Sequence, residues 1–335
     1  MSSNASLKDI STVLDFPARG VKFELETPWM ITSGILSHPG AFRRYAGCFS
    51  AGIGKSIGYD VREGDQTPVT AEVRSGGKFI GLINAVGLSN IGRERAFEEL
   101  QEIYPKLNEA GIYFFASIFG DTAEEMAAVV EKLDPVCDAF ELNDSCPNIK
   151  PGESSGISIG KKPELVAVTT RAVRRVTDKP IWIKHTAAVY IYSPSLAMEV
   201  ALAGQEEGAD GHSTINTVPG GMVIDIHARR PILSRDYGGL SGPAVRPIAV
   251  GHIYALYETL GPDVPLIGVG GIETAENVVE RVEAGASAVA IGTVLRNKDE
   301  EGIIEYATGM ENDLKGLLEE LDVDSLMELR GAAHR

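Results

Sequence analysis

Residues 265–293, PLIGVGGIETAENVVERVEAGASAVAIGT, show most clearly how predicted strands and helices alternate along the chain. An apolar run, Pro265–Gly270, is followed by a segment with helical spacing, Ala275–Ala284, and by a second apolar run, Ala288–Gly292. Short apolar runs rich in β-branched residues are typical of buried strands, and the apolar residues of the middle segment recur on one helix face. This stretch therefore predicts a β–α–β unit.

The same alternation of strand and helix continues through the rest of the chain. Six further apolar runs predict strands at Trp29–Gly34, Gly52–Ile57, Tyr113–Phe119, Ala139–Asn143, Ile181–Lys184 and His212–Asn216. Helical spacing recurs in Glu94–Ala110, Thr122–Leu133, Glu164–Thr177, Ser195–Glu207 and Ala244–Leu260. Eight predicted strands that alternate with helical segments predict an α/β protein with a closed (β/α)8 TIM barrel. An open doubly wound sheet is the weaker alternative, because no GxGxxG motif opens a helix after the first strand.

We expect one barrel domain over residues 1–335, with a short N-terminal lead (1–20) and a C-terminal helical tail (300–335). Two connections are long and rich in Gly, Ser and Pro, namely Tyr59–Gly92 after the second strand and Ile149–Pro163 after the fourth. Both leave the carboxyl ends of strands, where barrel enzymes place their chemistry. We expect these two connections to act as lids.

The composition disfavours several classes of protein. Lys and Arg number 31 and Asp and Glu 47, so the formal net charge is −16. Most of this surface would repel a nucleic acid or an anionic membrane, and we expect neither as a partner. The cysteines, Cys48, Cys137 and Cys146, lack the CxxC spacing of zinc or iron–sulfur sites. No signal peptide or long apolar segment is visible, so a cytoplasmic location fits best.

The stretch Glu141–Asn148, ELNDSCPN, resembles the end of a strand that opens into an active-site loop. Pro147 cannot donate to a sheet and holds Cys146 extended, so we expect the thiol to face outward. Between Asn143 and Asn148, a thiol can take a proton from a planar polar substrate. A lone Cys-Pro pair is more often a turn with a half-buried cysteine, but the other motifs favour a base.

Glycine-rich turns follow the predicted sixth, seventh and eighth strands, at Gly238–Pro243, Gly268–Gly271 and Gly292–Thr293. Any tight β–α turn can use glycines, so each turn alone is a moderate signal. Barrels often bind phosphate with backbone amides at this position. The three turns together favour a phosphorylated ligand.

Polar side chains end several of the predicted strands. Lys55 and Lys184 close the second and fifth strands, where each could be a snorkelling or ion-paired lysine. Together they could stabilise negative charge on a reduced cofactor or a carboxylate substrate. Four asparagines end or follow apolar runs: Asn84, Asn143, Asn148 and Asn216. Each could be a turn former, but together they suit a ligand with alternating C=O and N–H groups.

Histidine and metal chemistry have little support. His185 follows Lys184, and strand alternation points the two side chains to opposite sides, so we expect His185 to pack behind the site. The sequence has no HExxH and no GxSxG motif, so the predicted site contains neither a metal nor a serine triad.

Taken together, these motifs resemble those of the dihydroorotate dehydrogenases. The motifs are ITSG at 31–34, GKS at 54–56, NAVGLSN at 84–90, ELNDSCPN, IWIK, STINT, GGLSGPAVRP at 238–247, GVGGIETAENV and AIGT. The resemblance implies an FMN-bearing barrel that oxidises (S)-dihydroorotate to orotate in de novo pyrimidine (UMP) biosynthesis. A cysteine at the position of Cys146 implies the soluble class 1 enzymes.

Within class 1, the resemblance is closer to the NAD-linked branch than to the fumarate-using one. This branch implies a second subunit with FAD and an iron–sulfur cluster, and a homodimer at the core of the assembly. The terminal electron acceptor, whether NAD, fumarate or a quinone, is left open by the sequence.

The resemblance also implies roles for individual residues. Cys146 is the implied base for the C5 proton, and Lys55 and Lys184 supply positive charge. The implied substrate-binding residues are Lys55, Asn84, Asn143, Asn148, Asn216 and Thr217. The implied FMN-binding residues are Ser33, Gly34, Lys55, Ser56, Asn143, Lys184, Ile215, Ser241, Gly242, Gly270, Gly271, Gly292 and Thr293.

Three alternatives remain open from the sequence. A relative could oxidise another dihydropyrimidine that lacks the carboxylate, although Asn148 favours orotate because those enzymes tend to have histidine there. A phosphate-binding barrel lyase or isomerase could use the same turns and lysines without a flavin. A non-catalytic binding subunit is disfavoured, because the candidate base and the amides are all present.

Overall fold

A closed barrel of eight parallel strands forms the centre of the molecule. The computed structural model describes residues 8–36, 38–144 and 159–335. In order around the barrel, the strands are β3 (Trp29–Ile31), β4 (Ala51–Ile53), β9 (Tyr113–Ile118), β10 (Ala139–Leu142), β11 (Ile181–Lys184), β12 (Gly211–Thr214), β17 (Leu266–Val269) and β18 (Ala288–Ile291). Strand β18 pairs with β3, with Ile291 opposite Ile31, and so closes the barrel. The predicted TIM barrel is confirmed, and each predicted apolar run overlaps one of its strands, although β4 and β12 each begin one residue before the predicted run.

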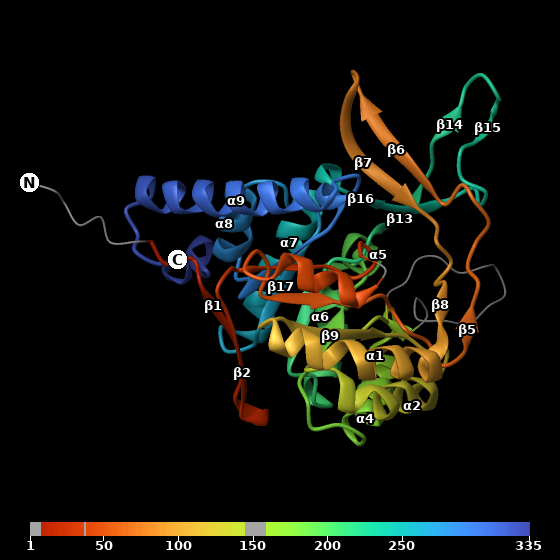
Figure 1. Cartoon of the computed structure of the whole chain (residues 1–335), viewed down its shortest axis with the longest axis horizontal. Helices are drawn as coiled ribbons and strands as arrows, with labels where there is room; N and C mark the ends of the chain where they lie inside the picture. The colour runs from red at the N-terminus through yellow and green to blue at the C-terminus, as the bar shows by residue number, and fades with distance from the viewer. Residues whose placement is uncertain (1–7, 37, 145–158) are drawn as a thin grey trace, which may run out of the picture.

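Helices surround the barrel (Figure 1). They are α1 (Gly92–Glu109), α2 (Ala123–Leu133), α4 (Pro163–Arg174), α5 (Ala187–Tyr192), α6 (Pro194–Glu206), α7 (Arg246–Leu260), α8 (Ala275–Glu283) and α9 (Glu300–Glu320). Their ends follow local chemistry: the Thr122 hydroxyl, for example, accepts a hydrogen bond from the Glu125 N–H at the start of α2. The described part of the connection between β3 and β4 contains a 3-10 segment, η2 (Pro39–Tyr45).

The region expected as a C-terminal tail contains α9 and two 3-10 turns, η6 (Leu326–Leu329) and η7 (Ala332–His334). Helix α9 packs against α8 and η2, and buries Ile303, Ala307 and Leu314. It therefore covers the side of the barrel where the last strand meets the first. Whether residues 1–335 form one domain stays a prediction.

An antiparallel hairpin, β1 (Thr12–Phe16) and β2 (Val21–Leu25), closes the amino-terminal end of the barrel. The Phe16 ring stacks on Trp182 with centroids 6.3 Å apart, and the Phe23 ring lies 5.1 Å from Phe115. Both partner residues belong to barrel strands and are fully buried. These aromatic contacts close the amino-terminal end of the barrel, so a site can open at the carboxyl ends of the strands.

A four-stranded antiparallel sheet stands over that opposite end, in the order β13 (Val218–Gly221), β16 (Gly238–Ser241), β7 (Lys78–Asn84) and β6 (Thr70–Ser75). We call it the roof sheet. Two short ladders accompany it, β5 (Val61–Arg62) with β8 (Asn90–Ile91) and β14 (Ile224–Asp225) with β15 (Arg230–Pro231). Figure 1 shows β6, β7, β14 and β15 projecting from the barrel.

The roof sheet corrects one expectation. The glycines of Gly238–Pro243 predict a turn after a barrel strand, but most of this stretch is strand β16, which pairs with β7. A Cβ built on Gly238 would lie 2.5 Å from the Asn84 carbonyl oxygen, so this glycine permits close strand pairing. The stretch bends only at Gly242, whose φ is 91°, before the 3-10 turn η4 (Pro243–Val245).

The two expected lids differ in what the structure describes. The connection over 59–92 contains strands β5 to β8. Much of the connection after the fourth strand, 145–158, lies outside the described residues. The lid function of both stays a prediction. Among the helices described, none combines the length and the apolar character needed to cross a bilayer.

Candidate active site

A cavity of about 590 Å³ lies between the carboxyl ends of the barrel strands and the roof sheet. This volume is within the usual range for small-molecule sites. The predicted site residues that line it are Ser33, Gly34, Lys55, Ser56, Asn84, Asn143, Lys184, Ile215, Asn216, Thr217, Ser241, Gly242, Gly270, Gly271, Gly292 and Thr293. The other two, Cys146 and Asn148, lie outside the described residues. The structure thus brings the described candidates together, while their individual roles stay predictions.

A buried ion pair lies at one side of the cavity. The Lys184 ammonium donates to the Ser33 hydroxyl at 2.8 Å and to the Glu141 carboxylate at 3.1 Å. The second Glu141 oxygen accepts from the Ser213 hydroxyl at 3.1 Å. Glu141 is fully buried on β10, next to the strand that carries Lys184. Glu141 holds the Lys184 ammonium at the cavity wall and partly compensates its positive charge.

Two of the predicted asparagines contact each other. Asn216 Nδ2 donates to Asn143 Oδ1 at 3.2 Å, and Asn143 Nδ2 donates to the Ser56 hydroxyl at 2.9 Å. The Asn216 carbonyl oxygen also accepts from the Thr217 N–H at 2.8 Å. These bonds orient the two carboxamides, which come from the ends of β10 and β12. An oriented amide pair can read a planar ligand with alternating donors and acceptors.

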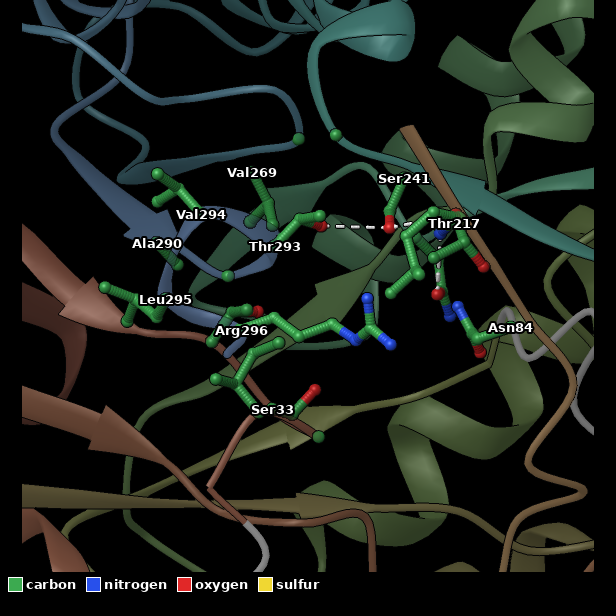
Figure 2. A pocket seen from close by; sticks show the side chains of 18 of the residues that line it. Ser33, Asn84, Thr217, Ser241, Val269, Ala290, Thr293, Val294, Leu295 and Arg296 are labelled. Carbon is green, nitrogen blue, oxygen red and sulfur yellow. Dashed lines mark hydrogen bonds between the residues drawn. The ribbon is translucent and has the colours of Figure 1, made fainter. Parts of the chain in front are cut away.

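The roof sheet contributes to the same cavity (Figure 2). Asn84 at the end of β7 donates to the Gly239 carbonyl at 3.2 Å. The Thr293 hydroxyl donates to Ser241 at 2.9 Å, and Ser241 donates to the Leu82 carbonyl at 3.2 Å. This chain of bonds joins the turn after β18 to the roof sheet. These hydrogen bonds therefore hold the roof sheet in place over the carboxyl ends of the barrel strands.

The turns after β17 and β18 present backbone N–H groups. Gly270 and Gly271 have φ of 104° and 71°, a region that glycine adopts easily. Within the described part of the chain, the N–H groups of Gly271, Gly292 and Thr293 donate to no other protein group. Groups of this kind bind phosphate well, since each is a polar donor that folding has left available.

Sequence reasoning missed several residues of the site. Glu141 stands within an apolar run, and nothing in the sequence indicates that its carboxylate pairs with Lys184. Arg296 and Lys298 also line the cavity, and Arg296 extends across it in Figure 2. The Arg296 guanidinium pairs with Glu72 of the roof sheet at 3.5 Å. Two cations shortly after the glycine turn at Gly292 were the signal that could have indicated them.

His185 packs behind the site, as expected from strand alternation. It is buried, and its Nε2 lies 2.8 Å from Nδ1 of His212. Nε2 of His212 in turn lies 3.0 Å from Oε1 of Gln205, so these rings form a chain behind the sheet. Burial lowers the pKa of His185 to about 4 and lowers those of His212 and His252 well below 6.5. The three rings are therefore neutral at physiological pH.

Comparisons with known proteins agree with this geometry. The family model described as "Dihydroorotate dehydrogenase" matches residues 18–312. Three similar proteins are each named "Dihydroorotate dehydrogenase B (NAD(+)), catalytic subunit". That of Pyrococcus abyssi is 42% identical over 94% of this chain and 97% of its own length, and that of Pyrococcus furiosus is 40% identical over the same shares. That of Anoxybacillus flavithermus is 38% identical over 92% of each chain.

The relatives match over nearly the whole chain, and the family-model match over residues 18–312 includes every described candidate residue. The predicted resemblance to the NAD-linked branch of class 1 is confirmed by the names of these relatives. The family depends in general on a flavin. The chain therefore belongs to the dihydroorotate dehydrogenase family.

Proposed function

We propose that this chain oxidises (S)-dihydroorotate to orotate in de novo pyrimidine biosynthesis, with FMN as its cofactor. The observation that carries the proposal is the convergence of the Asn143–Asn216 amide pair and Lys184 on one cavity with glycine turns at its edge. A ring with two amide groups and a carboxylate matches that set of donors, acceptors and cations.

The residues present fit FMN. The turns at Gly270–Gly271 and Gly292–Thr293 offer N–H donors for a phosphate, and the Ser241 and Thr293 hydroxyls lie beside them. A Cβ built on Gly34 would meet no protein atom within 4 Å, so this glycine leaves open space at the cavity wall. Since the chain has a net charge of −16, an anionic cofactor needs local cations, and lysine and arginine side chains line the cavity.

Lys184 has a defined role in this proposal. When FMN is bound, it supplies the acceptor for the hydride that leaves C6 of the substrate. Lys184 provides positive charge at the cavity wall, held in place by Ser33 and Glu141. Because these contacts already orient the Lys184 side chain, it needs little reorganisation when negative charge develops in the cavity.

The remaining polar residues bind and deprotonate the substrate. Asn84, Asn143, Asn216 and Thr217 would hold its amides and carboxylate, with Asn148 and Lys55 contributing. Cys146 would remove the C5 proton as a thiolate. An ordinary thiol has a pKa of about 8.5, so we expect the rate of substrate oxidation to rise with pH on the alkaline side.

We further propose that the chain acts with a separate electron-transfer subunit, because the relatives are named as catalytic subunits of an NAD(+) enzyme. An FAD and iron–sulfur protein, a homodimeric core of this chain and a cytoplasmic location complete the proposal. The test is anaerobic reduction by dihydroorotate, then separate addition of NAD(+), fumarate and a quinone. Recovery of flavin colour with NAD(+) only in the presence of the partner would support it, and recovery with fumarate alone would contradict it.

The base is tested by replacing Cys146 with Ala. We expect flavin reduction by dihydroorotate to slow by roughly 10²–10⁴-fold, the usual effect of removing a positioned base. Cys48→Ala is the matched control, because Cys48 lies on the connection between β3 and β4 and does not line the cavity. An unchanged rate of bleaching in Cys146→Ala would remove Cys146 from this role.

A further inference from the structure

A fully buried arginine lies behind the glycine turn that follows β17. Arg281 belongs to helix α8, and its side chain has no exposed surface. Its aliphatic part packs against Gly268 of β17, where a built Cβ would lie 3.2 Å from Arg281 Cδ. The glycine at 268 thus makes room for a long side chain between helix and strand.

The guanidinium of Arg281 binds the turn directly. Nη2 donates to the Gly270 carbonyl at 2.6 Å and to the Arg246 carbonyl at 3.4 Å. Nη1 lies 3.3 Å from Glu280 Oε2, which also pairs with Arg246 Nη1 at 3.0 Å. Burial lowers the pKa of Arg281 to about 10, so the group is still a cation at neutral pH.

Burying a charged side chain at this position has a high cost in free energy. An apolar residue of similar volume would fill the same space without the desolvation penalty of a buried cation. The only carboxylate that pairs with it among the described residues is Glu280, which is partly exposed. The charge is therefore only partly compensated, and its field acts on the turn that it contacts.

The contact fixes the direction of one peptide group. The Gly270–Gly271 peptide is trans, so its C=O and N–H point in opposite directions. Because the Gly270 carbonyl accepts from Arg281, the Gly271 N–H of the same peptide points away from the guanidinium, and Gly271 itself lines the cavity. A Cβ on Gly271 would lie 2.8–3.0 Å from atoms of Arg246, so the turn packs tightly against α7 as well.

We propose that Arg281 is a positioning residue for the phosphate of the flavin nucleotide. It holds the Gly271 N–H toward the cavity, and its hydrogen bond to the Gly270 carbonyl polarises the peptide so that this N–H is a stronger donor. Its positive charge behind the turn adds attraction for a dianion. This inference rests on the proposed function, because it requires FMN to bind at this turn.

The test compares a flavin that carries the phosphate with one that lacks it. The full-length protein is freed of flavin, and the dissociation constants of FMN and riboflavin are measured by flavin fluorescence. We expect Arg281→Met to weaken FMN about 10- to 100-fold, the effect of losing a charge-assisted contact, and riboflavin less than about threefold. Arg281→Lys keeps a cation without the planar fork, and we expect an intermediate loss of FMN affinity.

Arg174→Met is the matched control. Arg174 is a mostly buried arginine of α4 that also binds carbonyl groups, those of Thr177 and Lys179, but it does not line or support the cavity. We expect this variant to lose stability while it keeps the wild-type preference for FMN over riboflavin.

The outcomes separate the two proposals. If the wild-type protein binds no FMN, the proposed function fails. If wild type prefers FMN and both Arg281 variants retain that preference, or lose FMN and riboflavin affinity equally, only the role of Arg281 is overturned. If Arg281→Met does not fold, the test uses Arg281→Lys. A ratio of the FMN and riboflavin dissociation constants equal to that of the wild-type protein then contradicts the proposal.

Discussion

Lys184 Nζ lies 3.1 Å from Glu141 Oε1, and both side chains are buried where strands β11 and β10 reach the cavity. Burying two charges is favourable only if each compensates the other. The Ser33 and Ser213 hydroxyls complete the hydrogen bonding of the pair. The same contact therefore contributes to the stability of the barrel and to the electrostatics of the site.

Removing one partner of this pair should cost more than removing both. We expect Lys184→Met to lower the free energy of unfolding by roughly 3–5 kcal/mol, because Glu141 then remains buried without a counter-charge. Adding Glu141→Gln to that variant should restore much of the loss. Urea unfolding of the two single variants and the double variant forms a double-mutant cycle that measures the coupling.

The control for this cycle is the Arg95–Glu99 pair on α1, whose N···O distance is 3.0 Å and whose side chains are partly exposed. Exposed pairs of this spacing contribute only about 0.3–0.5 kcal/mol. We expect Arg95→Ala to change stability by no more than that. A loss in Lys184→Met no larger than the loss in this control would show that the buried pair is not coupled as described.

The amide pair should matter for the substrate more than for the fold. Asn216→Ala removes a donor to Asn143 and an acceptor for the Thr217 N–H. We expect kcat/KM for dihydroorotate to fall roughly tenfold to hundredfold, the effect of one hydrogen bond to a charged or polar ligand. Steady-state kinetics with the exposed Asn312→Ala as control checks this. Equal kinetic constants for both variants would contradict substrate binding by Asn216.

The buried histidines predict loss of stability in acid. Burial lowers the pKa of His185 from 6.5 to about 4, so between these values the unfolded chain binds more protons than the folded one. Stability is therefore lost as pH falls through this window, by roughly 2 kcal/mol between pH 6.5 and 5 from this residue. Unfolding of His185→Gln over this range should show a shallower slope. An unchanged slope, equal to that of the exposed His227→Gln, would exclude this cause.

Asp144 predicts a slope of the opposite sign. The carboxyl is fully buried, and neither of its oxygens has a partner among the described residues, so burial raises its pKa from 3.8 to about 7. The folded protein then binds the extra proton, and this contribution to stability is lost as pH rises toward 7. We expect Asp144→Asn to remove a loss of roughly 2 kcal/mol between pH 5 and 7. Asp236→Asn, at an exposed position, serves as control, and an Asp144→Asn profile that matches it would refute the assignment.

The barrel could be predicted because its strands have a strong local signal. Ile181–Lys184 is buried along its whole length, and its apolar residues can be recognised in the sequence without knowledge of the neighbouring strands. The carboxyl ends of parallel strands lie together, so Lys55, Asn143 and Gly270 could be assigned to one mouth from their positions alone. The cavity lined by these residues shows that this argument places a site correctly.

The roof sheet and the buried pair could not be predicted in the same way. Strand β7 pairs with β16, so that Asn84 contacts Gly239, which is 155 positions away along the chain. The glycines that allow this close pairing look the same in the sequence as glycines of a turn. Likewise, the contact between Glu141 and Lys184 depends on which strands are neighbours and on their register, and neither can be read from one sequence.

In the proposed reaction, dihydroorotate bound in this cavity is oxidised by a flavin bound beside it. The most direct measurement is an anaerobic titration of the purified, FMN-loaded protein with dihydroorotate, with dihydrouracil, which lacks the carboxylate, as the comparison. We expect each equivalent of dihydroorotate to bleach one equivalent of flavin and to yield one equivalent of orotate, while dihydrouracil leaves the colour almost unchanged. A flavin that dihydroorotate does not bleach, or that dihydrouracil bleaches as fast, would contradict the proposed reaction.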